Sequence, residues 1–201
     1  MGIIINESVE SLIDENDSIE RNKKQEEYTE YIKNHILNVQ KAFLRYFVPL
    51  LERTNISTLI SDEELKNAIE IASTTIQYHD NSKWSDDEFD GYRMKYYPTV
   101  KEKADPDFQK LADEKFEKAW ESHYKHNWHH PKYWVKEDGS IEDMKLEAII
   151  DMICDWRSFS ISKNNPNEVL EWYENEAFDE KKNMTDRTRE IVEELLFRVC
   201  S

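Results

Sequence analysis

The stretch Tyr78-His79-Asp80-Asn81-Ser82-Lys83 closes a predicted helix with an imidazole, a carboxylate and an ammonium group. Before it, apolar side chains recur at steps of three and four residues, the spacing of one helix face: Leu65, Ile69, Ala72 and Ile76. His79 and Lys83 continue this spacing, so both are expected on the inward face. The run Ser61-Asp62-Glu63-Glu64 has the pattern of a capping box, which predicts a helix from 61 to about 80.

The His79-Asp80 pair can serve a metal ion. An imidazole nitrogen and a carboxylate oxygen at one helix end can converge on a single cation, and the carboxylate keeps a second oxygen that can bridge to another. The alternative interpretation is a core histidine that is hydrogen-bonded to a neighbour.

Composition predicts an all-α protein. The chain has 201 residues with three glycines and five prolines, too few for the turns of an all-β fold, while its apolar residues fall in long helical blocks. This length suits one domain with an arm. Residues 1–26 are rich in Glu, Asp, Asn and Ser, which indicates a mobile arm or a weak helix that docks against a partner. Residues 27–201 form the expected helical domain.

Charge restricts the partners. The chain carries 27 basic and 43 acidic residues, a formal net charge of −16, which argues against binding of long nucleic acids. Small anionic substrates stay possible where a bound metal reverses the local field. Cys154 and Cys200 do not make a disulfide framework, no apolar run is long enough to cross a membrane, and no signal peptide is present. We therefore expect a cytoplasmic protein without a membrane partner, and a homodimer is possible.

Three further predicted helices also turn polar groups inward. A helix over 28–47 places His35 mid-helix on its buried face, and a helix that begins at Pro106 has an apolar stripe that ends at His123. Because the residue before a proline avoids helical geometry, the helix should break near His129 and leave His129-His130 on a turn. A helix over 141–160 carries Asp155 on its inward face, with Asp151 one turn earlier.

The remaining segments read as connections and scaffold. Ser85-Asp86-Asp87-Glu88 predicts another capped helix, which runs to about Tyr96, and residues 99–105 are expected to be a loop. Two last helices are expected to begin at 165–166 and 185–186, without inward histidines.

One cause can explain these buried polar groups. Burying one such group without a partner costs roughly 2–7 kcal/mol, so several together must satisfy one another or share a cation. A metal cluster accounts for all of them, and a buried polar network without metal is the alternative. Asp151 ranks below Asp155 because its helical neighbours are less apolar. His126 is either a support for the ligands or a surface residue.

The order of these residues resembles the HD-domain superfamily of metal-dependent phosphohydrolases, over about residues 28–160. The resemblance rests on a His, then His79-Asp80 with a lysine three residues later, then further histidines that include a His-His pair, then a late Asp. It implies that one metal is bound by His35, His79, Asp80 and Asp155. It also implies that Asp80 bridges to a second metal, for which His123, His129 and His130 could supply ligands.

A narrower resemblance concerns the segments around the same residues. A bacterial and phage family known only as a domain of unknown function is similar to this chain in the segments His79-Asp80-Asn81-Ser82-Lys83-Trp84-Ser85, Glu88-Phe89, Ala119-Trp120, His129-His130 and Asp155-Trp156. This match names no substrate.

The resemblance implies a phosphohydrolase that acts on a small nucleotide or another phosphoester, with one or two divalent transition metals (Mn, Fe, Ni or Zn). Asp80 and Lys83 are the catalytic candidates, and Lys83 would contact phosphate or orient Asp80, unless its ammonium simply reaches solvent. Arg93 and Arg157 are weaker anion ligands. Trp84, Tyr92 and Tyr96 could stack on a base or belong to the core.

Two other functions use the same ligands. Some relatives in the superfamily hold two irons and cleave a carbon bond with oxygen, so a di-iron oxygenase acting on a small molecule is one alternative. A phage or bacterial factor that binds a nucleotide without turnover is the other.

Overall fold

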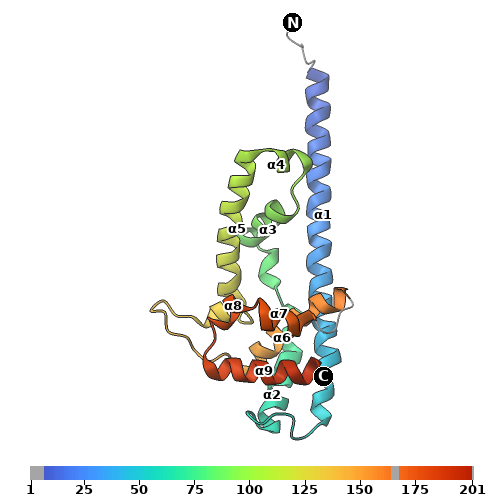
Figure 1. The fold of residues 1–201 in the computed structure, drawn as a ribbon. Coiled ribbons are helices and arrows are strands. Elements are labelled where there is room, and N and C mark those ends of the chain that lie inside the picture. Colours follow the sequence, from blue (N-terminus) through green and yellow to red (C-terminus); the bar gives the residue numbers. More distant parts are fainter. Residues whose placement is uncertain (1–6, 164–167, 201) are drawn as a thin grey trace. The chain divides into compact units, whose positions relative to one another are not determined.

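The elements of secondary structure in the described part of the chain are helices (Figure 1). A computed structural model describes residues 7–163 and 168–200, and no strand occurs among them apart from an isolated bridge between Val135 and Ile141. The all-α prediction is therefore confirmed. The elements are α1 (Glu7–Tyr46), η1 (Val48–Glu52), α2 (Asp62–Thr75), η2 (Ile76–Tyr78), η3 (Asn81–Trp84), α3 (Asp86–Tyr96), α4 (Val100–Ala104), α5 (Pro106–His126), η4 (Pro131–Trp134), α6 (Leu146–Lys163), α7 (Glu168–Asn175), α8 (Phe178–Lys181) and α9 (Asp186–Cys200).

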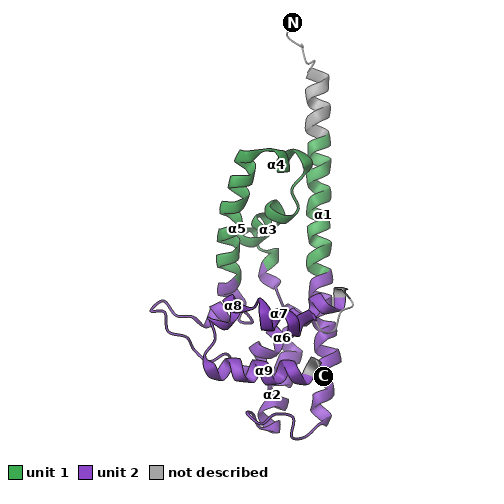
Figure 2. Cartoon of the chain, viewed as in Figure 1, with its two compact units in different colours: residues 1–33, 83–123 green, residues 34–82, 124–201 purple. Residues whose placement is uncertain are grey.

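Two compact units divide the chain (Figure 2). Unit 1 comprises Met1–Lys33 and Lys83–His123, and unit 2 comprises Asn34–Ser82 and Tyr124–Ser201. Helix α1 contributes residues to both, and the domain boundary predicted after residue 26 lies within it. That boundary stays a prediction, and we describe each unit by itself.

The core of unit 2 forms around the contact between α2 and α6, and α6 also packs against α7 and α9. The predicted α2 stripe is confirmed, since Leu65, Ile69, Ala72 and Ile76 are all buried. Residues 148–150 and 152–154 of α6 are buried against the same core. Apolar burial therefore fixes α6, which carries the two aspartates, and α2, which leads through η2 to His79.

Unit 1 contains the first part of α1 together with α3, α4 and most of α5. Helices α3 and α5 meet at Gly91, where an added Cβ would lie 2.6 Å from Ala119 Cβ and 2.7 Å from the Lys115 carbonyl oxygen. No side chain larger than hydrogen fits this crossing without a backbone shift. Aromatic rings pack beside it, among them Tyr28 and Tyr92 with centroids 6.4 Å apart.

The N-terminal segment is helical from Glu7 onward. The sequence predicted either a mobile arm or a weak helix for residues 1–26, and residues 7–26 form a helix. It docks on α4 of the same unit. Glu20 Oε1 accepts a hydrogen bond from the Val100 amide at 3.0 Å, Arg21 Nε lies 3.2 Å from Glu102 Oε1, and Asp17 pairs with Lys101. Residues 1–6 lie outside the described residues.

Several predicted boundaries are wrong. Helix α2 ends at Thr75 rather than near Asp80, and His79 follows the 3-10 turn η2 with an extended ψ of 132°. The expected loop over 99–105 contains α4, because Thr99 and Glu102 form a complete capping box. Helix α6 begins at Leu146, not 141. The helix start expected at 165–166 lies outside the described residues.

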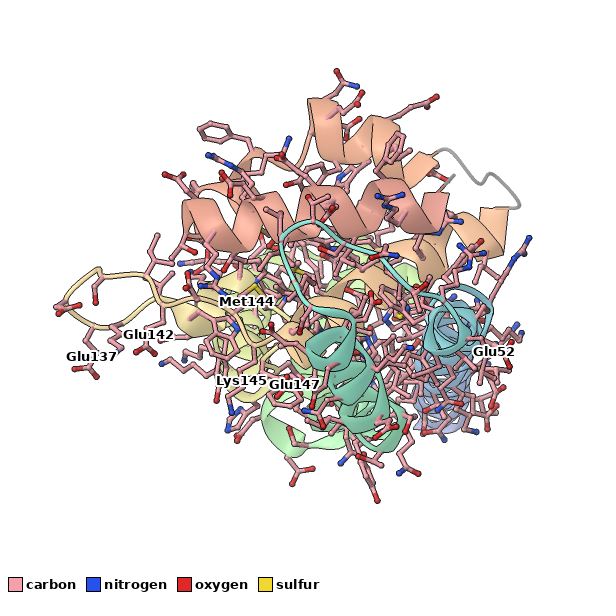
Figure 3. All side chains as sticks on the ribbon, turned by 90° about the horizontal axis from the view of Figure 1, so that it is seen from below. Glu52, Glu137, Glu142, Met144, Lys145 and Glu147 are labelled. Atoms are coloured by element: carbon pink, nitrogen blue, oxygen red, sulfur yellow. The ribbon has the colours of Figure 1, made fainter. Side chains whose placement is uncertain are left out.

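Other boundaries are confirmed. Helix α5 begins at Pro106, with Asp105 accepting a hydrogen bond from the Asp107 amide at 2.9 Å, and α9 begins at Asp186. The break expected before Pro131 is present, since α5 ends at His126 and His129-His130 lie on a turn. The next loop, which carries Glu137 and Glu142, extends away from the helices of unit 2 (Figure 3). Within the described ranges, no helix is long and apolar enough to cross a membrane.

Candidate metal centre

Three segments of unit 2 bring the candidate ligands together. His35 comes from α1, His79 and Asp80 follow η2, and Asp151 and Asp155 lie one turn apart on α6. Asp80 adopts a left-handed backbone with φ of 56°, a region that Asp tolerates better than most residues. This conformation directly follows the end of η2 and orients the Asp80 carboxylate toward the two imidazoles.

Two histidine nitrogens each lie close to oxygens of two aspartates. His35 Nε2 lies 3.3 Å from His79 Nε2, 3.2 Å from Asp80 Oδ2 and 3.1 Å from Asp155 Oδ1. His79 Nε2 in turn lies 3.5 Å from Asp80 Oδ2 and 3.7 Å from Asp155 Oδ1. Around a tetrahedral metal with bonds of about 2.1 Å, the ligand atoms are about 3.4 Å apart. These five distances are close to that spacing, and His35, His79 and Asp80 form one group that could hold a metal while His79 and Asp155 belong to a second, overlapping group.

Asp151 fixes the orientation of His79. Asp151 Oδ1 lies 2.9 Å from His79 Nδ1, and a carboxylate can only accept at that distance, so the Nδ1 proton is donated to it. In the neutral ring, the lone pair of His79 is then on Nε2, which faces the other three ligand atoms. Such a carboxylate behind a ligand histidine is the usual support of metal sites.

The other nitrogen of His35 is also engaged. Its Nδ1 lies 3.3 Å from Ser158 Oγ on α6, and its ring packs against Phe159 with centroids 5.4 Å apart. Ser158 is buried. The imidazole of His35 is therefore held by α6 on one side while its Nε2 faces the two carboxylates.

The second oxygen of Asp80 faces a different histidine. Asp80 Oδ1 lies 3.6 Å from His129 Nε2, and His129 Nδ1 lies 3.6 Å from Asp151 Oδ2. The His129 and His130 rings are tilted by 44° with centroids 4.3 Å apart, and each can offer a ligand nitrogen within 4.8 Å of an Asp80 oxygen. Asp80 thus lies between two sets of histidines, which is the arrangement that a bridging carboxylate requires.

Electrostatics favour a cation at this centre. Burial alone lowers the histidine pKa values, but Asp155 and Asp80 outweigh it and raise the pKa of His35. Asp80 and Asp151 likewise hold the pKa of His79 well above its ordinary value. Burial would raise the pKa of Asp155, yet His35 and His79 hold it well below the usual range. The carboxylates therefore stay charged and attract a proton or a metal ion.

These buried His and Asp groups could hold a metal ion. The donor set is two imidazole nitrogens and two carboxylate oxygens, which suits Mn, Fe, Zn or Ni and does not select among them.

A family model describes residues 24–198 of the chain, as a family of unknown function, DUF5662. The chain belongs to the DUF5662 family. Comparison with curated proteins and with solved structures found no match.

In this DUF5662 protein, several predicted site residues lie in unit 1. His123 is buried on α5, where its Nδ1 lies 2.8 Å from Glu88 Oε2. The Lys83 ammonium lies 5.4 Å from the centroid of the Tyr92 ring, and Trp84 is half-exposed. The roles of His123, Lys83 and Trp84 at the metal centre stay predictions.

Two more of these residues have structural contacts inside unit 1. Arg93 Nη1 lies 2.7 Å from Glu102 Oε2, a buried ion pair between α3 and α4. Tyr92 packs edge-on against Phe116 with centroids 5.3 Å apart, and Tyr96 meets the same ring at 5.2 Å. Tyr92 is buried whereas Tyr96 is exposed. These contacts suit a core role for Tyr92, and the proposed substrate contacts of Arg93, Tyr92 and Tyr96 stay predictions.

The lower-ranked candidates in unit 2 have different surroundings; they are Asp151, Arg157 and His126. Asp151 supports the centre directly, as described above. Arg157 is fully buried with its guanidinium 4.1 Å from the centroid of the Tyr46 ring. His126 is exposed at the end of α5, the surface placement that was one of its two alternatives.

Sequence reasoning missed one contact at the candidate centre and one contact of a candidate residue in unit 1. Ser158 lies three residues after Asp155 on the same α6 face, so helical spacing could have found it. The second contact joins Glu88 to His123. The sequence pattern predicts a capping box that contains Glu88, but the Ser85 side chain makes no cap hydrogen bond. Glu88 is buried against His123 instead.

Proposed function

We propose that this protein is a metal-dependent phosphohydrolase that acts on a small phosphoester, with a nucleotide as the first candidate. The observation that carries the proposal is that His35 Nε2 and His79 Nε2 lie 3.3 Å apart and each lies within 3.1–3.7 Å of both Asp80 Oδ2 and Asp155 Oδ1. The resemblance to the HD superfamily supports the phosphoester as substrate.

Each residue has a distinct part in this proposal. A bound divalent metal would lower the pKa of a coordinated water and neutralise charge on the phosphoryl group. His35, His79 and Asp155 would hold the metal, and Asp80 would hold it with one oxygen and reach the His129 side with the other. Asp151 would keep the Nε2 lone pair of His79 available. Lys83 is proposed to contact the phosphate.

Turnover of a panel of nucleotides and simple phosphoesters tests the proposal. The full chain is loaded with Mn or Fe and assayed with and without oxygen. Phosphate release that depends on metal and not on oxygen is the expected result. Oxygen consumption with an organic substrate, without phosphate release, would favour a di-iron oxygenase. Tight nucleotide binding without turnover under any condition would favour a binding protein.

Two variants separate metal binding from chemistry. Asp80→Asn is expected to abolish turnover through loss or misplacement of metal. Lys83→Ala is expected to keep metal content near that of the wild type and to lower kcat/KM by roughly 10²–10³, the scale of one lost charged stabiliser. Lys118→Ala, at an exposed position of α5, is the matched control. Wild-type kcat/KM in Lys83→Ala would remove Lys83 from the mechanism.

A further inference from the structure

A cavity adjoins the candidate metal centre within unit 2. Its volume is about 320 Å³, at the lower end of the range of small-molecule sites. Asp155 lines the cavity and also contributes a ligand atom to the centre, and His130 lines the same side. A molecule bound at the metal could therefore extend directly into this space.

One part of the cavity wall is apolar and largely aromatic. Trp156 and Phe159 come from α6, and Val169 and Trp172 come from α7. The Trp156 and Trp172 rings meet at 65° with centroids 5.1 Å apart. Such a wall favours an apolar or flat group, and aromatic faces also attract positive charge.

The polar part of the wall is acidic. Glu168 at the start of α7 and Glu180 on α8 both line the cavity, and no lysine or arginine is among the described residues that line it. Burial, together with the charges of Asp155 and Asp179, raises the pKa of Glu180 to about 7. With Asp155, the lining of the cavity holds three carboxyl groups. An anionic group would be repelled here.

Ser160 adds an independent sign of a ligand. Its hydroxyl is buried, lines the cavity and has no hydrogen-bond partner among the described residues. Buried hydroxyl groups normally have a partner, because leaving one unpaired costs about 1–3 kcal/mol. A bound molecule with a polar edge would satisfy it.

We propose that this cavity binds the organic part of the substrate through N–H donors, neutral or cationic, carried on an apolar or aromatic body. The inference rests on the proposed function for the phosphate end, which would lie at the metal while the nitrogen-bearing end faces Glu168 and Glu180. Two sources offer this chemistry: a base with adjacent N–H donors, such as guanine, and an alkylammonium group. Both supply donors to carboxylates and present no negative charge to them.

Binding of phosphate-free ligands tests the proposal without turnover. Calorimetry on the full chain, with and without added Mn, compares guanosine with inosine, which lacks the exocyclic amine, and butylamine with butanol. We expect the donor-bearing member of at least one pair to bind about tenfold tighter, the scale of one charge-assisted hydrogen bond. The pair that shows the difference identifies the source of the N–H donors. Equal binding within both pairs, or no binding of any of the four, would overturn the proposal.

Variants test whether Glu168 and Glu180 cause the preference for the donor-bearing ligand. Glu180→Gln and Glu168→Gln should each reduce the preference for the donor-bearing ligand at least about threefold, whereas the matched control Glu171→Gln, at an exposed position of α7, should leave it unchanged. Thermal melting of each variant verifies that it folds. A preference that survives in both cavity variants would contradict the assignment. Because this assay needs no phosphate and no metal, a failure of hydrolysis and a failure of the cavity proposal give different results.

Discussion

Asp151 Oδ1 lies 2.9 Å from His79 Nδ1, which makes Asp151 the residue that sets the tautomer of a candidate metal ligand. The same carboxylate lies 3.6 Å from His129 Nδ1 through its other oxygen. One aspartate thus hydrogen-bonds to one candidate ligand histidine and lies close to a second. The metal affinity of the whole centre should depend on a residue that does not touch the metal.

Asp151→Asn is expected to weaken metal binding by about 10–100-fold, because an amide accepts the Nδ1 proton less well and can present its NH₂ group to the ring instead. Competition with a chelating dye measures the affinity. The matched control is Asp179→Asn, whose side chain is 83% exposed and pairs with Lys182 in the same turn. Equal affinity of Asp151→Asn and wild type would show that Asp151 is a packing residue only.

Sequence patterns identified the candidate ligands of this centre more successfully than the contacts and helix ends that position them. Helical periodicity found His35, His79 and Asp155 because each lies on a face that is otherwise apolar. It could not place Asp151 behind His79, since the partners are 72 residues apart and only the packing of α2 against α6 joins them. The end of α2 was also missed, because no glycine or proline marks it and the left-handed turn falls on Asp80.

The cavity was beyond sequence reasoning for the same reason. Glu168 and Glu180 lie on two short helices whose apolar residues predicted only scaffold. Their relation to Asp155 depends on the tertiary packing of unit 2. In sequence alone, a charged residue on a short helix is usually interpreted as solvent-exposed, so nothing marked these glutamates as cavity residues.

Gly91→Ala is expected to destabilise unit 1 by about 1–3 kcal/mol, because its Cβ would lie 2.6 Å from Ala119 Cβ and 2.7 Å from the Lys115 carbonyl oxygen. Urea unfolding followed by tryptophan fluorescence measures the loss. Gly91→Ala combined with Ala119→Gly should recover part of it, since one of the two clashes is removed. A Gly91→Ala protein as stable as wild type would mean that α3 and α5 cross less closely than described.

Glu102 should make stability depend on pH in the acid range. Burial would raise its pKa, but a hydrogen bond from Arg93 at 2.7 Å and one from the Thr99 amide at 2.9 Å lower it below the ordinary 4.5. A carboxylate with a lowered pKa stabilises the fold fully above its unfolded pKa and loses that contribution as the pH falls through the folded value.

Glu102→Gln should therefore lower the free energy of unfolding by about 1–3 kcal/mol at pH 7, and the difference from wild type should shrink as the pH falls below about 4.5. Urea unfolding at a series of pH values gives both quantities. Glu117→Gln, at an exposed position of α5, is the control. A difference that stays constant down to pH 3 would show that the charge of Glu102 does not contribute.

His79→Ala should lose both metal and stability. Removal of the imidazole leaves Asp151 without its 2.9 Å donor and opens one position of the centre. We expect a loss of about 1–3 kcal/mol in the metal-free protein, the usual result when a buried partner is left unsatisfied. Added metal should raise the melting temperature of the wild type but not that of the variant. A metal-dependent shift of equal size in both proteins would place the metal elsewhere.

Elemental analysis of protein purified without chelator tests the metal centre most directly. With His35, His79, Asp80 and Asp155 in place, the wild type should carry about one to two equivalents of transition metal per chain, and His79→Ala should carry much less. A metal-free wild type that also shows no thermal shift with Mn, Fe, Zn or Ni would contradict the account and leave the cluster as a buried polar network.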